Sequence, residues 1–410
     1  MKVVGLIAEY NPFHNGHAYH IQKAKELTGA DSVIVLMSGD FVQRGAPAVM
    51  SKYLRTQMAL QAGASAVFEL PVCYATGSAE LFAYGAVSLL DRLGVVDSLC
   101  FGSECDNLSE LDKIASVLVS EPEAYSCVLK RELKKGASYP SARQKALQSY
   151  FQTEDCAFLL EQPNNILGIE YLKALKKLHS KIRPYTIRRV ESDYHETELQ
   201  EHYSSASSLR HFLTRSEQFP EDLERQVPSS ALPLYRETFR REYPVTPNAL
   251  SSITQYMLLK TPVKKLCRYM DMSEDLARRI KNQFHHYTDY QQFCELLKTK
   301  ELTYTRISRA LLHTVLGIKQ KRTNAFLNDQ VHYYAHLLGF RKDQKQILSV
   351  IKKESDLLLF TRTADEKKLS KAGKAMRRQD VFASNLYQTL ISGQYHTPFE
   401  NDLKKSVLKI

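Results

Sequence analysis

The sequence predicts an α/β fold, with a parallel sheet in the first half of the chain and a mostly α-helical, basic second half. First, short apolar runs alternate with longer helical patterns over residues 1–110, with Gly or Pro at their boundaries. Second, these runs are too short for helices and resemble strands that are covered on both faces. Third, strand signals fade beyond residue 240. Right-handed crossovers between such strands would give a doubly wound, Rossmann-like sheet.

Five strands are expected in the first half, at residues 3–8, 32–37, 66–70, 98–101 and 185–190. Helices are expected at residues 17–27, 52–62, 79–93, 167–178 and 204–213. The last of these begins with several serines, which are good N-caps. Polar helical patterns at 108–119, 123–136 and 141–153 lie between the fourth and fifth strands, so residues 107–160 are expected to form a helical insertion.

In the second half, helices are expected at residues 249–260, 273–285, 289–299, 303–316, 328–338 and 342–355. Residues 241–410 hold 30 Lys and Arg against 16 Asp and Glu, whereas residues 1–240 hold 26 against 29. The whole net charge of +11 therefore lies in the second half. We predict two domains, residues 1–240 and 241–410, and a polyanion as the partner of the second domain. A well-solvated surface is the alternative explanation of the charge.

Composition excludes several classes of protein. Apolar residues make up 43% of the chain and aromatic residues 10%, which is typical of a folded domain and not of a disordered one. No apolar run approaches the roughly 20 residues that a membrane-spanning helix needs, and no signal-peptide pattern opens the chain. The seven cysteines are scattered and odd in number, which favours a reducing cytoplasm over a disulfide framework, and no metal site is expected.

The most informative segment, GLIAEYNPFHNGHAYH, spans residues 5–20. A strand ends near Ala8, a turn with a proline follows, and the HNGH sequence opens a helix. Ligands of open α/β sheets bind at the carboxyl ends of strands, and a helix N-terminus there attracts anions. His14 and His17 are three residues apart, so both can face a phosphate group and stabilise its charge. Two surface histidines, or part of a metal site, are the alternatives.

Further segments resemble phosphate-binding and substrate-binding loops. They are MSGDFVQRG at residues 37–45, FGSE at 101–104 and SSASSLR at 204–210. The first two follow predicted strands. The third offers hydroxyl groups, backbone N–H groups and a guanidinium group, all of which bind phosphate.

Taken together, eight segments resemble the bacterial tRNA(Met) cytidine acetate ligases of the HxGH nucleotidyltransferase superfamily. They are EYNPFHNGH, MSGDFVQRG, ELP, FGSE, KKGASYP, PNNILG, SDYH and SASSLR, in this order over residues 1–215. The resemblance implies a two-step reaction. Acetate and ATP would form acetyladenylate and pyrophosphate, and the acetyl group would then pass to N4 of the wobble cytidine of elongator tRNA(Met), giving N4-acetylcytidine.

The resemblance also implies a set of ATP-binding residues. They are Ile7, Ala8, Glu9, Tyr10, Asn11, Pro12, Phe13, His14, Asn15, Gly16, His17, Ala18, Tyr19, His20, Gly102, Asn164, Arg189, Val190, Ser205, Ser207 and Arg210. His14 and His17 would be the catalytic pair in adenylation. A turn residue is the alternative for Asn164, a helix cap for the two serines, and Arg188 could face outward in place of Arg189.

Other positions are less specific. Asp40 and Arg44 follow the second strand and are candidates for positioning acetate or RNA. The residues after His17 include no lysine in the first helical turn, so a lysine clamp on the phosphates is not expected there. No general base for the acetyl transfer stands out. Mg²⁺ is a candidate because ATP chemistry commonly uses it.

The basic second half is predicted to contact tRNA. Its clusters are Lys264-Lys265-Arg268, Arg278-Arg279-Lys281, Lys319-Lys321-Arg322, Arg341-Lys342-Lys345 and Lys371-Lys374-Arg377-Arg378. Basic side chains supply most non-specific affinity for RNA, and aromatic side chains stack on unpaired bases. Tyr and Phe residues lie between these clusters, although most of them are expected to be core.

Two other functions are compatible with the same motifs. One is a nucleotidyltransferase that adenylates a small metabolite, which the basic second half disfavours. The other is a non-catalytic RNA-binding factor, which would not need the intact HNGH motif and Arg210. The sequence predicts no membrane partner and no DNA partner, and it leaves the oligomeric state open.

Overall fold

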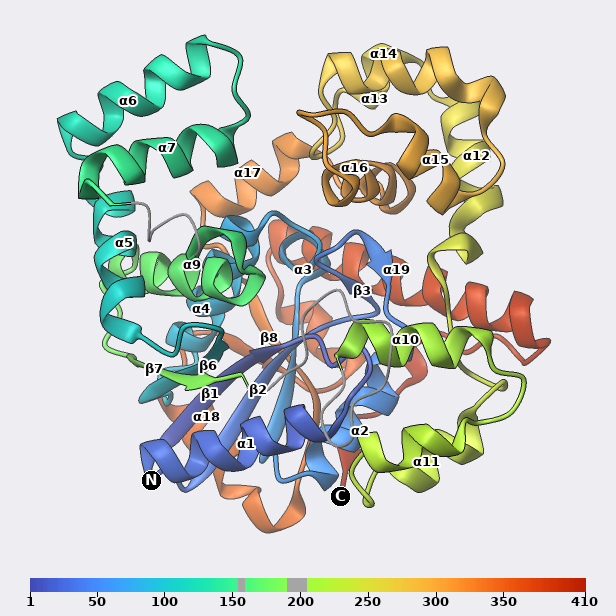
Figure 1. The fold of residues 1–410 in the computed structure, drawn as a ribbon. Helices are drawn as coiled ribbons and strands as arrows, with labels where there is room; N and C mark the ends of the chain where they lie inside the picture. Colours follow the sequence, from blue (N-terminus) through green and yellow to red (C-terminus); the bar gives the residue numbers. More distant parts are fainter. Residues whose placement is uncertain (154–158, 190–204) are drawn as a thin grey trace.

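The computed structural model describes residues 1–153, 159–189 and 205–410, and a β-sheet with helices around it forms its centre (Figure 1). The strand order of this sheet is β10-β8-β5-β2-β1-β6-β7, and β9 pairs with β8. The strands are β1 Val3–Ala8, β2 Ser32–Ser38, β5 Ala66–Leu70, β6 Ser98–Ser103, β7 Arg183–Arg188, β8 Tyr334–Phe340, β9 Leu358–Phe360 and β10 Leu408–Lys409. β5, β2, β1, β6 and β7 are parallel to one another, which confirms the five predicted strands. Their carboxyl ends form one edge of the sheet, and the conspicuous segments of the sequence follow these ends.

Helices cover both faces of the sheet. On one face lie α1 (Asn15–Thr28), α2 (Lys52–Gln61), α10 (Ala206–Arg215) and α11 (Leu232–Thr238), in a core that includes Val33 and Val35. On the other face lie α4 (Ala79–Arg92), α5 (Leu108–Ser120), α9 (Pro163–Lys177) and α18 (Gln346–Glu354), in a core that includes Ile34 and Leu36. Consecutive residues of β2 therefore enter opposite cores, as the period of a strand requires. The predicted doubly wound arrangement is confirmed.

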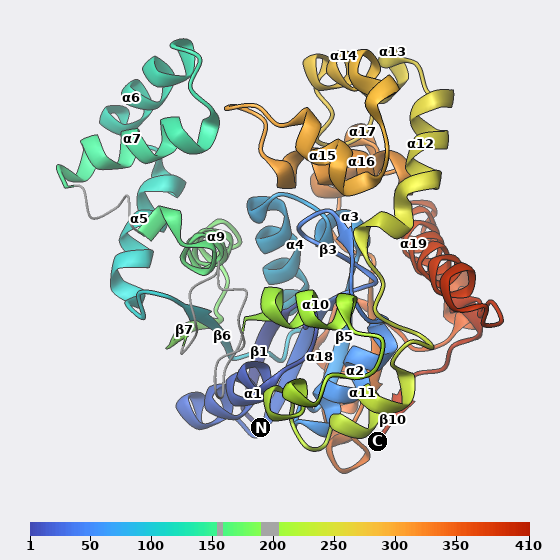
Figure 2. The same cartoon turned by 45° about the vertical axis from the view of Figure 1, so that its right-hand side comes forward.

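Two groups of helices stand over the carboxyl edge of the sheet (Figures 1 and 2). The insertion consists of α5 with the hairpin of α6 (Glu123–Lys134) and α7 (Tyr139–Phe151), which are close to the helices predicted at residues 108–119, 123–136 and 141–153. The second group, which we call the helical bundle, is made of α12 (Ser251–Lys260), α13 (Val263–Leu266), α14 (Glu274–Gln283), α15 (Tyr290–Leu297), α16 (Tyr304–Leu316) and α17 (Gln320–Asn328).

The last part of the chain returns to the sheet, and here one prediction was wrong. The helix predicted at residues 328–338 is not formed, because Tyr334–Phe340 is strand β8, antiparallel to β5. Residues Tyr334 to Leu338 are all buried, so this stretch of the sequence is apolar without a break. A continuous apolar run shows neither the helical period nor the alternation of a half-exposed strand, so it is compatible with a buried strand and with a helix. The long helix α19 (Lys371–Tyr395) was not predicted.

The predicted boundary at residue 240 stays a prediction. The structure separates the helical bundle from the sheet core, but β8, β9 and β10 complete the sheet that the first half begins. Among the described residues, no helix is both long and apolar enough to cross a membrane.

Candidate active site

The two histidines of the HNGH segment form the N-terminus of α1. His14 is the N-cap, and its Nδ1 accepts a hydrogen bond from the backbone N–H of Gly16 at 3.1 Å. His17 lies at the third helical position, and its Nδ1 accepts from the backbone N–H of His14 at 3.3 Å. The two rings lie against each other, with centroids 3.8 Å apart. This is a reciprocal capping box in which histidines take the usual places of Ser and Glu.

The capping box determines which nitrogen of each ring carries the proton. A ring nitrogen that accepts a backbone N–H has no proton of its own, so each neutral imidazole carries its proton on Nε2. Burial, with Arg189 and Arg210 nearby, lowers the pKa of His14 to about 3. Burial, then His14 and Arg189, holds the pKa of His17 well below its usual value. Both rings are therefore neutral donors at pH 7 and suit an anionic ligand.

The turn between β1 and α1 is held by contacts from several parts of the chain. Tyr10 adopts a left-handed backbone conformation, with φ of 50°, and the Asn11-Pro12 peptide bond is cis. The side-chain oxygen of Asn11 accepts the backbone N–H of Val49 at 2.7 Å. The hydroxyl of Tyr235 donates to the carbonyl of Phe13. These two hydrogen bonds fix the position of the histidine pair before any ligand binds.

Two arginines from distant segments reach the same place. Arg210 on α10 donates to the carbonyl of Asn11 at 2.5 Å and to the hydroxyl of Ser207 at 2.9 Å. Its burial lowers its pKa to about 10, so it stays charged at pH 7. Arg189 directly follows β7, and its charge acts on His14, His17 and the half-buried His20. The end of β1, the end of β7 and the start of α10 therefore meet at one place. Arg189 and Arg210 bring positive charge to it.

The FGSE and PNNILG segments interlock. The carboxylate of Glu104 accepts the side-chain N–H of Asn164 at 2.6 Å and the backbone N–H of Asn165 at 2.8 Å. In return, the side-chain oxygen of Asn165 accepts the backbone N–H of Glu104 at 3.0 Å. Asn164 also accepts from Arg189 at 2.7 Å, so this lock orients the arginine toward the histidines. Glu104 and Asn165 were not predicted as site residues, although both belong to the motifs that were identified.

Gly102 lies directly beneath Arg189. A Cβ atom added to Gly102 would lie 3.0 Å from Cγ of Arg189, which is tighter than normal contact. A side chain at this position would displace the arginine. The absence of a side chain at Gly102 therefore leaves room for Arg189 and for a ligand that approaches the backbone.

The other predicted residues have the following positions. Ile7 and Ala8 end β1, Ser205 is the N-cap of α10 and accepts the backbone N–H of Ser208, and Asn15 donates to the carbonyl of Arg225. Ala18 is half-buried and Tyr19 is exposed on α1. Val190, Ser204 and the SDYH segment lie outside the described residues. Ser205 has the capping role that was its alternative.

The loop after β2 has a structural contact that the sequence did not predict. Asp40 is buried, and one of its oxygens accepts the backbone N–H of Lys52 at 2.7 Å at the start of α2. The neighbouring Arg55 is fully buried and donates to the carbonyls of Glu9 and Gly39 at 2.6 and 2.5 Å. Arg55 thus ties the carboxyl ends of β1 and β2 together. No motif signalled it, because a lone arginine in a helical pattern resembles a surface residue.

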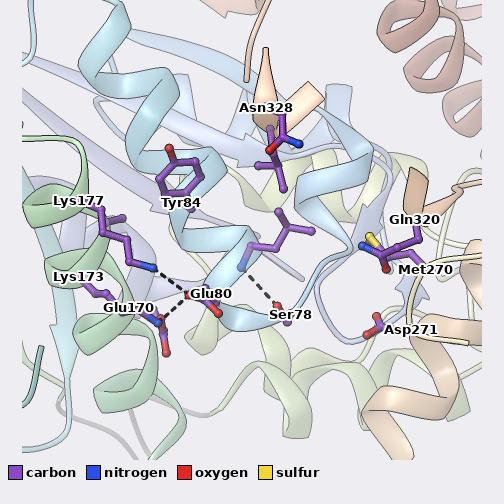
Figure 3. Close-up of a pocket in the computed structure, with 13 residues that line it drawn as sticks. Ser78, Glu80, Tyr84, Glu170, Lys173, Lys177, Met270, Asp271, Gln320 and Asn328 are labelled. Atoms are coloured by element: carbon purple, nitrogen blue, oxygen red, sulfur yellow. Dashed lines mark hydrogen bonds and ion pairs between the residues drawn. The ribbon is translucent and has the colours of Figure 1, made fainter. Parts of the chain in front are cut away.

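A cavity of about 690 Å³ lies elsewhere, between α4, α9 and the helical bundle (Figure 3). Its charged side chains are paired with one another: Lys173 contacts Glu80 at 2.7 Å and Glu170 at 3.1 Å. None of the predicted ATP-binding residues lines it. Because its charge is compensated internally, we do not assign ATP to this cavity.

The basic clusters of the second half are divided between two ends of the molecule. Clusters 264–268 and 319–322 meet on the helical bundle, where the backbone N–H of Gln320 donates to the carbonyl of Arg268. The cluster at 341–345 lies at the opposite edge of the sheet, because Phe340 pairs with Ala66 at the start of β5. Arg377, a member of the cluster at 371–378, is buried and binds Asp402, so it is not part of an exposed basic face. Lys371 and Arg378 on the same helix are exposed.

Among the described residues, no group of three or more His, Cys, Asp and Glu side chains is arranged to hold a metal ion. Glu104 is engaged by the Asn164–Asn165 segment, and Asp40 by α2. The part of the chain that the structure describes therefore forms no magnesium site of its own.

Comparison with known proteins agrees with this geometry. The family model described as HIGH Nucleotidyl Transferase matches residues 1–402. A tRNA(Met) cytidine acetate ligase of Acetivibrio thermocellus is 40% identical over 392 residues, covering 94% of each chain. The enzyme of the same name from Thermoanaerobacter sp. is 42% identical over 390 residues, covering 94% of this chain and 95% of its own.

Two crystal structures of Thermotoga maritima TmcAL cover 100% of both chains. The apo form has a TM-score of 0.94 at 33% identity. The form bound with alpha-thio ATP has a TM-score of 0.92 at 32% identity. A fold that matches over its whole length therefore accommodates an ATP analogue in that relative.

Proposed function

Because the chain belongs to the HIGH nucleotidyltransferase family and to its tRNA(Met) cytidine acetate ligases, we propose that it activates acetate with ATP and acetylates tRNA. In the first step a carboxylate oxygen of acetate attacks the α-phosphorus of ATP, and pyrophosphate leaves. In the second step N4 of the wobble cytidine of elongator tRNA(Met) attacks the acetyl carbon. AMP leaves, and N4-acetylcytidine is formed.

The observation that carries the first step is the histidine pair at the N-terminus of α1. Its two Nε2–H groups are preorganised by the capping box, and Arg189 and Arg210 lie beside it. Donors that are fixed before the reaction stabilise the charge that develops on the phosphates in the transition state. Two neutral histidines avoid the desolvation cost that two charged rings would carry in the empty site. The arginines supply the attraction for the triphosphate.

Asn164, Gly102 and residues 7–20 complete the proposed ATP site. The side chain of Asn164 accepts a hydrogen bond from Arg189 and donates one to Glu104, so its role in the proposed site is to position the arginine beside the nucleotide. Mg²⁺ is proposed to arrive with ATP and to be coordinated by phosphate oxygens and water, because Asp40 and Glu104 are engaged in protein contacts and the described residues hold no group arranged for a metal ion. No step of the proposed mechanism is routed through the metal.

We propose the helical bundle as the main tRNA-binding surface. Residues 247–328 hold 14 Lys and Arg against 6 Asp and Glu. Lys264, Lys265, Arg268, Lys321 and Arg322 are exposed, and none of them forms an ion pair with a described residue. Uncompensated surface charge of this kind binds phosphate groups and releases counterions. A tRNA substrate makes the cytoplasm the expected location.

The test is a pair of assays on the same preparation. The protein is incubated with ATP, labelled pyrophosphate and acetate, and exchange of label into ATP is measured. Labelled acetate and tRNA are then supplied, and label in elongator tRNA(Met) is measured after digestion to nucleosides. We expect acetate-dependent exchange and labelled N4-acetylcytidine. Exchange without labelled tRNA would indicate another acceptor, and absence of exchange from well-folded protein would refute the ligase function.

A further inference from the structure

The structure also bears on the second step, for which the sequence offered no general base. The inference rests on the proposed function. We propose that Glu9 is the general base that accepts the proton from N4 of the cytidine as the acetyl group is transferred.

Glu9 occupies the right place in the sheet. It directly follows β1, whose carboxyl end leads into the turn before His14. One carboxylate oxygen, Oε1, accepts the backbone N–H of Gln43 at 2.7 Å. Its own carbonyl accepts from Arg55 at 2.6 Å. The residue is therefore fixed at both ends, and the side chain is half-buried rather than sealed in the core.

The elements around Glu9 are those of the proposed ATP site. The charged and titratable groups that act on it are Arg44 from the loop after β3 (Phe41–Val42), Arg210 from α10, Arg55 from α2 and Tyr171 from α9. Arg210 also acts on His14, so the carboxylate and the histidine pair flank the same arginine. Burial raises the pKa of Glu9, while Gln43 and the arginines oppose that rise. Burial makes such a carboxylate a better proton acceptor than an exposed one, and the arginines favour its ionised form.

The other candidates are occupied or have the wrong proton. His14 and His17 carry their protons on Nε2, because each Nδ1 accepts a backbone N–H. Asp40 is buried, with one oxygen on the backbone N–H of Lys52, so a substrate cannot reach it as it can the half-buried Glu9. Glu104 binds the start of α9. Glu69 is paired with Lys52 at 2.9 Å. Of these described carboxylates, Glu9 is therefore the one that lies among Arg44 and Arg210 and is not taken up by a structural contact in the core.

The step balances. The lone pair of N4 forms a bond to the acetyl carbon, and the bond from that carbon to the phosphate oxygen of acetyladenylate breaks, so AMP leaves with the electron pair. N4 then carries one proton too many, and a carboxylate oxygen of Glu9 takes it. Removal of that proton as the tetrahedral intermediate forms or collapses prevents the amine from being expelled again. The proton passes to solvent once the products leave.

The test compares the two half-reactions in Glu9→Gln. Glutamine keeps an oxygen that can accept the N–H of Gln43, so the loop retains its contact, but the amide cannot take a proton. We expect acetyl transfer to tRNA to fall by about 10²–10³-fold, in the range for loss of a general base, and acetate-dependent exchange to fall at least tenfold less than transfer. Glu9→Asp should recover part of the transfer rate. Glu26→Gln, on the exposed side of α1, is the matched control and should change neither rate.

Three outcomes would overturn the inference. Equal losses in both half-reactions would place Glu9 in adenylation, and undiminished transfer would remove it from the mechanism altogether. If Glu9→Gln does not fold, the wild-type protein decides: single-turnover transfer should fall about tenfold per pH unit on the acid side, and a flat profile contradicts a carboxylate base. Failure of exchange in the wild type is a failure of the proposed function instead, so the two claims are separable.

Discussion

Two clusters of buried and half-buried ionisable side chains lie at the same edge of the sheet, and they differ in how their charge is compensated. The histidine cluster comprises His14, His17, Arg189 and Arg210 at the carboxyl ends of β1 and β7. The lysine cluster comprises Lys52, Glu69, His336, Arg377, Asp380 and Asp402, between the end of β5, α2, β8 and α19. The first faces the turn that opens α1, whereas the second fastens the last part of the chain to the sheet.

The lysine cluster satisfies its own charges. Lys52 is fully buried and lies 2.9 Å from Glu69 and 2.8 Å from Asp402. Asp402 also binds Arg377 at 3.1 Å, and His336 lies 2.6 Å from Glu69. The partners of Lys52 hold its pKa well above the usual value despite burial, and Lys52 in turn helps to lower the pKa of Glu69 to about 2. Lys52, Glu69 and Asp402 therefore stay charged together in the interior.

The histidine cluster is held differently. Among the described residues, Arg210 donates to the carbonyl of Asn11 and Arg189 to the side chain of Asn164, and the two imidazoles are neutral. An ion pair satisfies both of its charges within the protein, whereas a cation that is held by neutral acceptors still attracts an anionic ligand. The contrast teaches that the kind of partner, more than the number of ionisable side chains, distinguishes a structural cluster from a functional one.

The largest expected effect is on stability, from Lys52→Met. This change leaves Glu69 and Asp402 buried without their cation, and breaking a buried pair in this way costs about 3–5 kcal/mol. We expect the free energy of unfolding in urea to fall by that amount. Lys23→Met, on an exposed pair of α1, is the control and should change it by less than about 0.5 kcal/mol. A stable Lys52→Met variant with no exchange activity would make the lysine cluster catalytic and break the comparison.

The second prediction concerns His17→Gln. Glutamine at the third helical position can still accept the N–H of His14, so the capping box is kept and stability should change little. The Nε2–H donor is lost or misplaced, and we expect acetate-dependent exchange to fall by about 10²–10³-fold, as for loss of one oxyanion donor. Binding of tRNA should be retained, measured by filter binding at fixed salt. Loss of both activities would show that the histidine cluster is structural as well.

The third prediction extends the comparison to the surface. If uncompensated positive charge marks an anion site, then Lys264→Glu and Lys321→Glu together should weaken tRNA binding about 10–100-fold and reduce its dependence on salt. Exchange should stay near the wild-type rate. The matched control is Lys342→Glu with Lys345→Glu, because these residues lie beyond Phe340 at the opposite edge of the sheet. Equal effects of the two variants would show that only net charge matters.

Local patterns predicted the first half of this molecule well. The strands β1, β2, β5 and β6 are short apolar runs closed by turn residues, and the HNGH segment follows the first of them directly. Spacing alone placed His14 and His17 on one side of a helix start, and the structure brings their rings together. Such features depend on neighbours within a few residues, which a single sequence displays.

The rest depended on contacts that a single sequence does not display. β8 was predicted as helix because its residues are buried on both faces and its partner β5 lies more than 260 residues away. Arg377 resembles its exposed neighbour Arg378, but Asp402 draws it into the core. Lys52 and Arg55 have the same ambiguity. Whether a charge is buried and paired is decided by tertiary contacts, so the lysine cluster could not have been predicted from the sequence.

The smallest expected effect is on the pH dependence of stability, where His14 and Asp380, one from each cluster, act in opposite directions. The pKa of His14 is lowered from 6.5 to about 3, so the unfolded chain binds more protons between these values and stability rises with pH up to about 6.5. The pKa of Asp380 is raised from 3.8 to about 7 by burial and by Glu69, so the folded chain binds more protons and stability falls as pH rises to 7.

Neutral substitutions separate these contributions. Asn is a good N-cap, so His14→Asn keeps the start of α1 and removes only the titrating ring. Between pH 5 and 7, the free energy of unfolding should rise less steeply with pH in His14→Asn than in the wild type and more steeply in Asp380→Asn, by about 1–2 kcal/mol over the window in each case. Urea denaturation at pH 5, 6 and 7 measures both. The same shift in both variants would contradict the comparison, because it would mean that the two clusters respond to protons as one network.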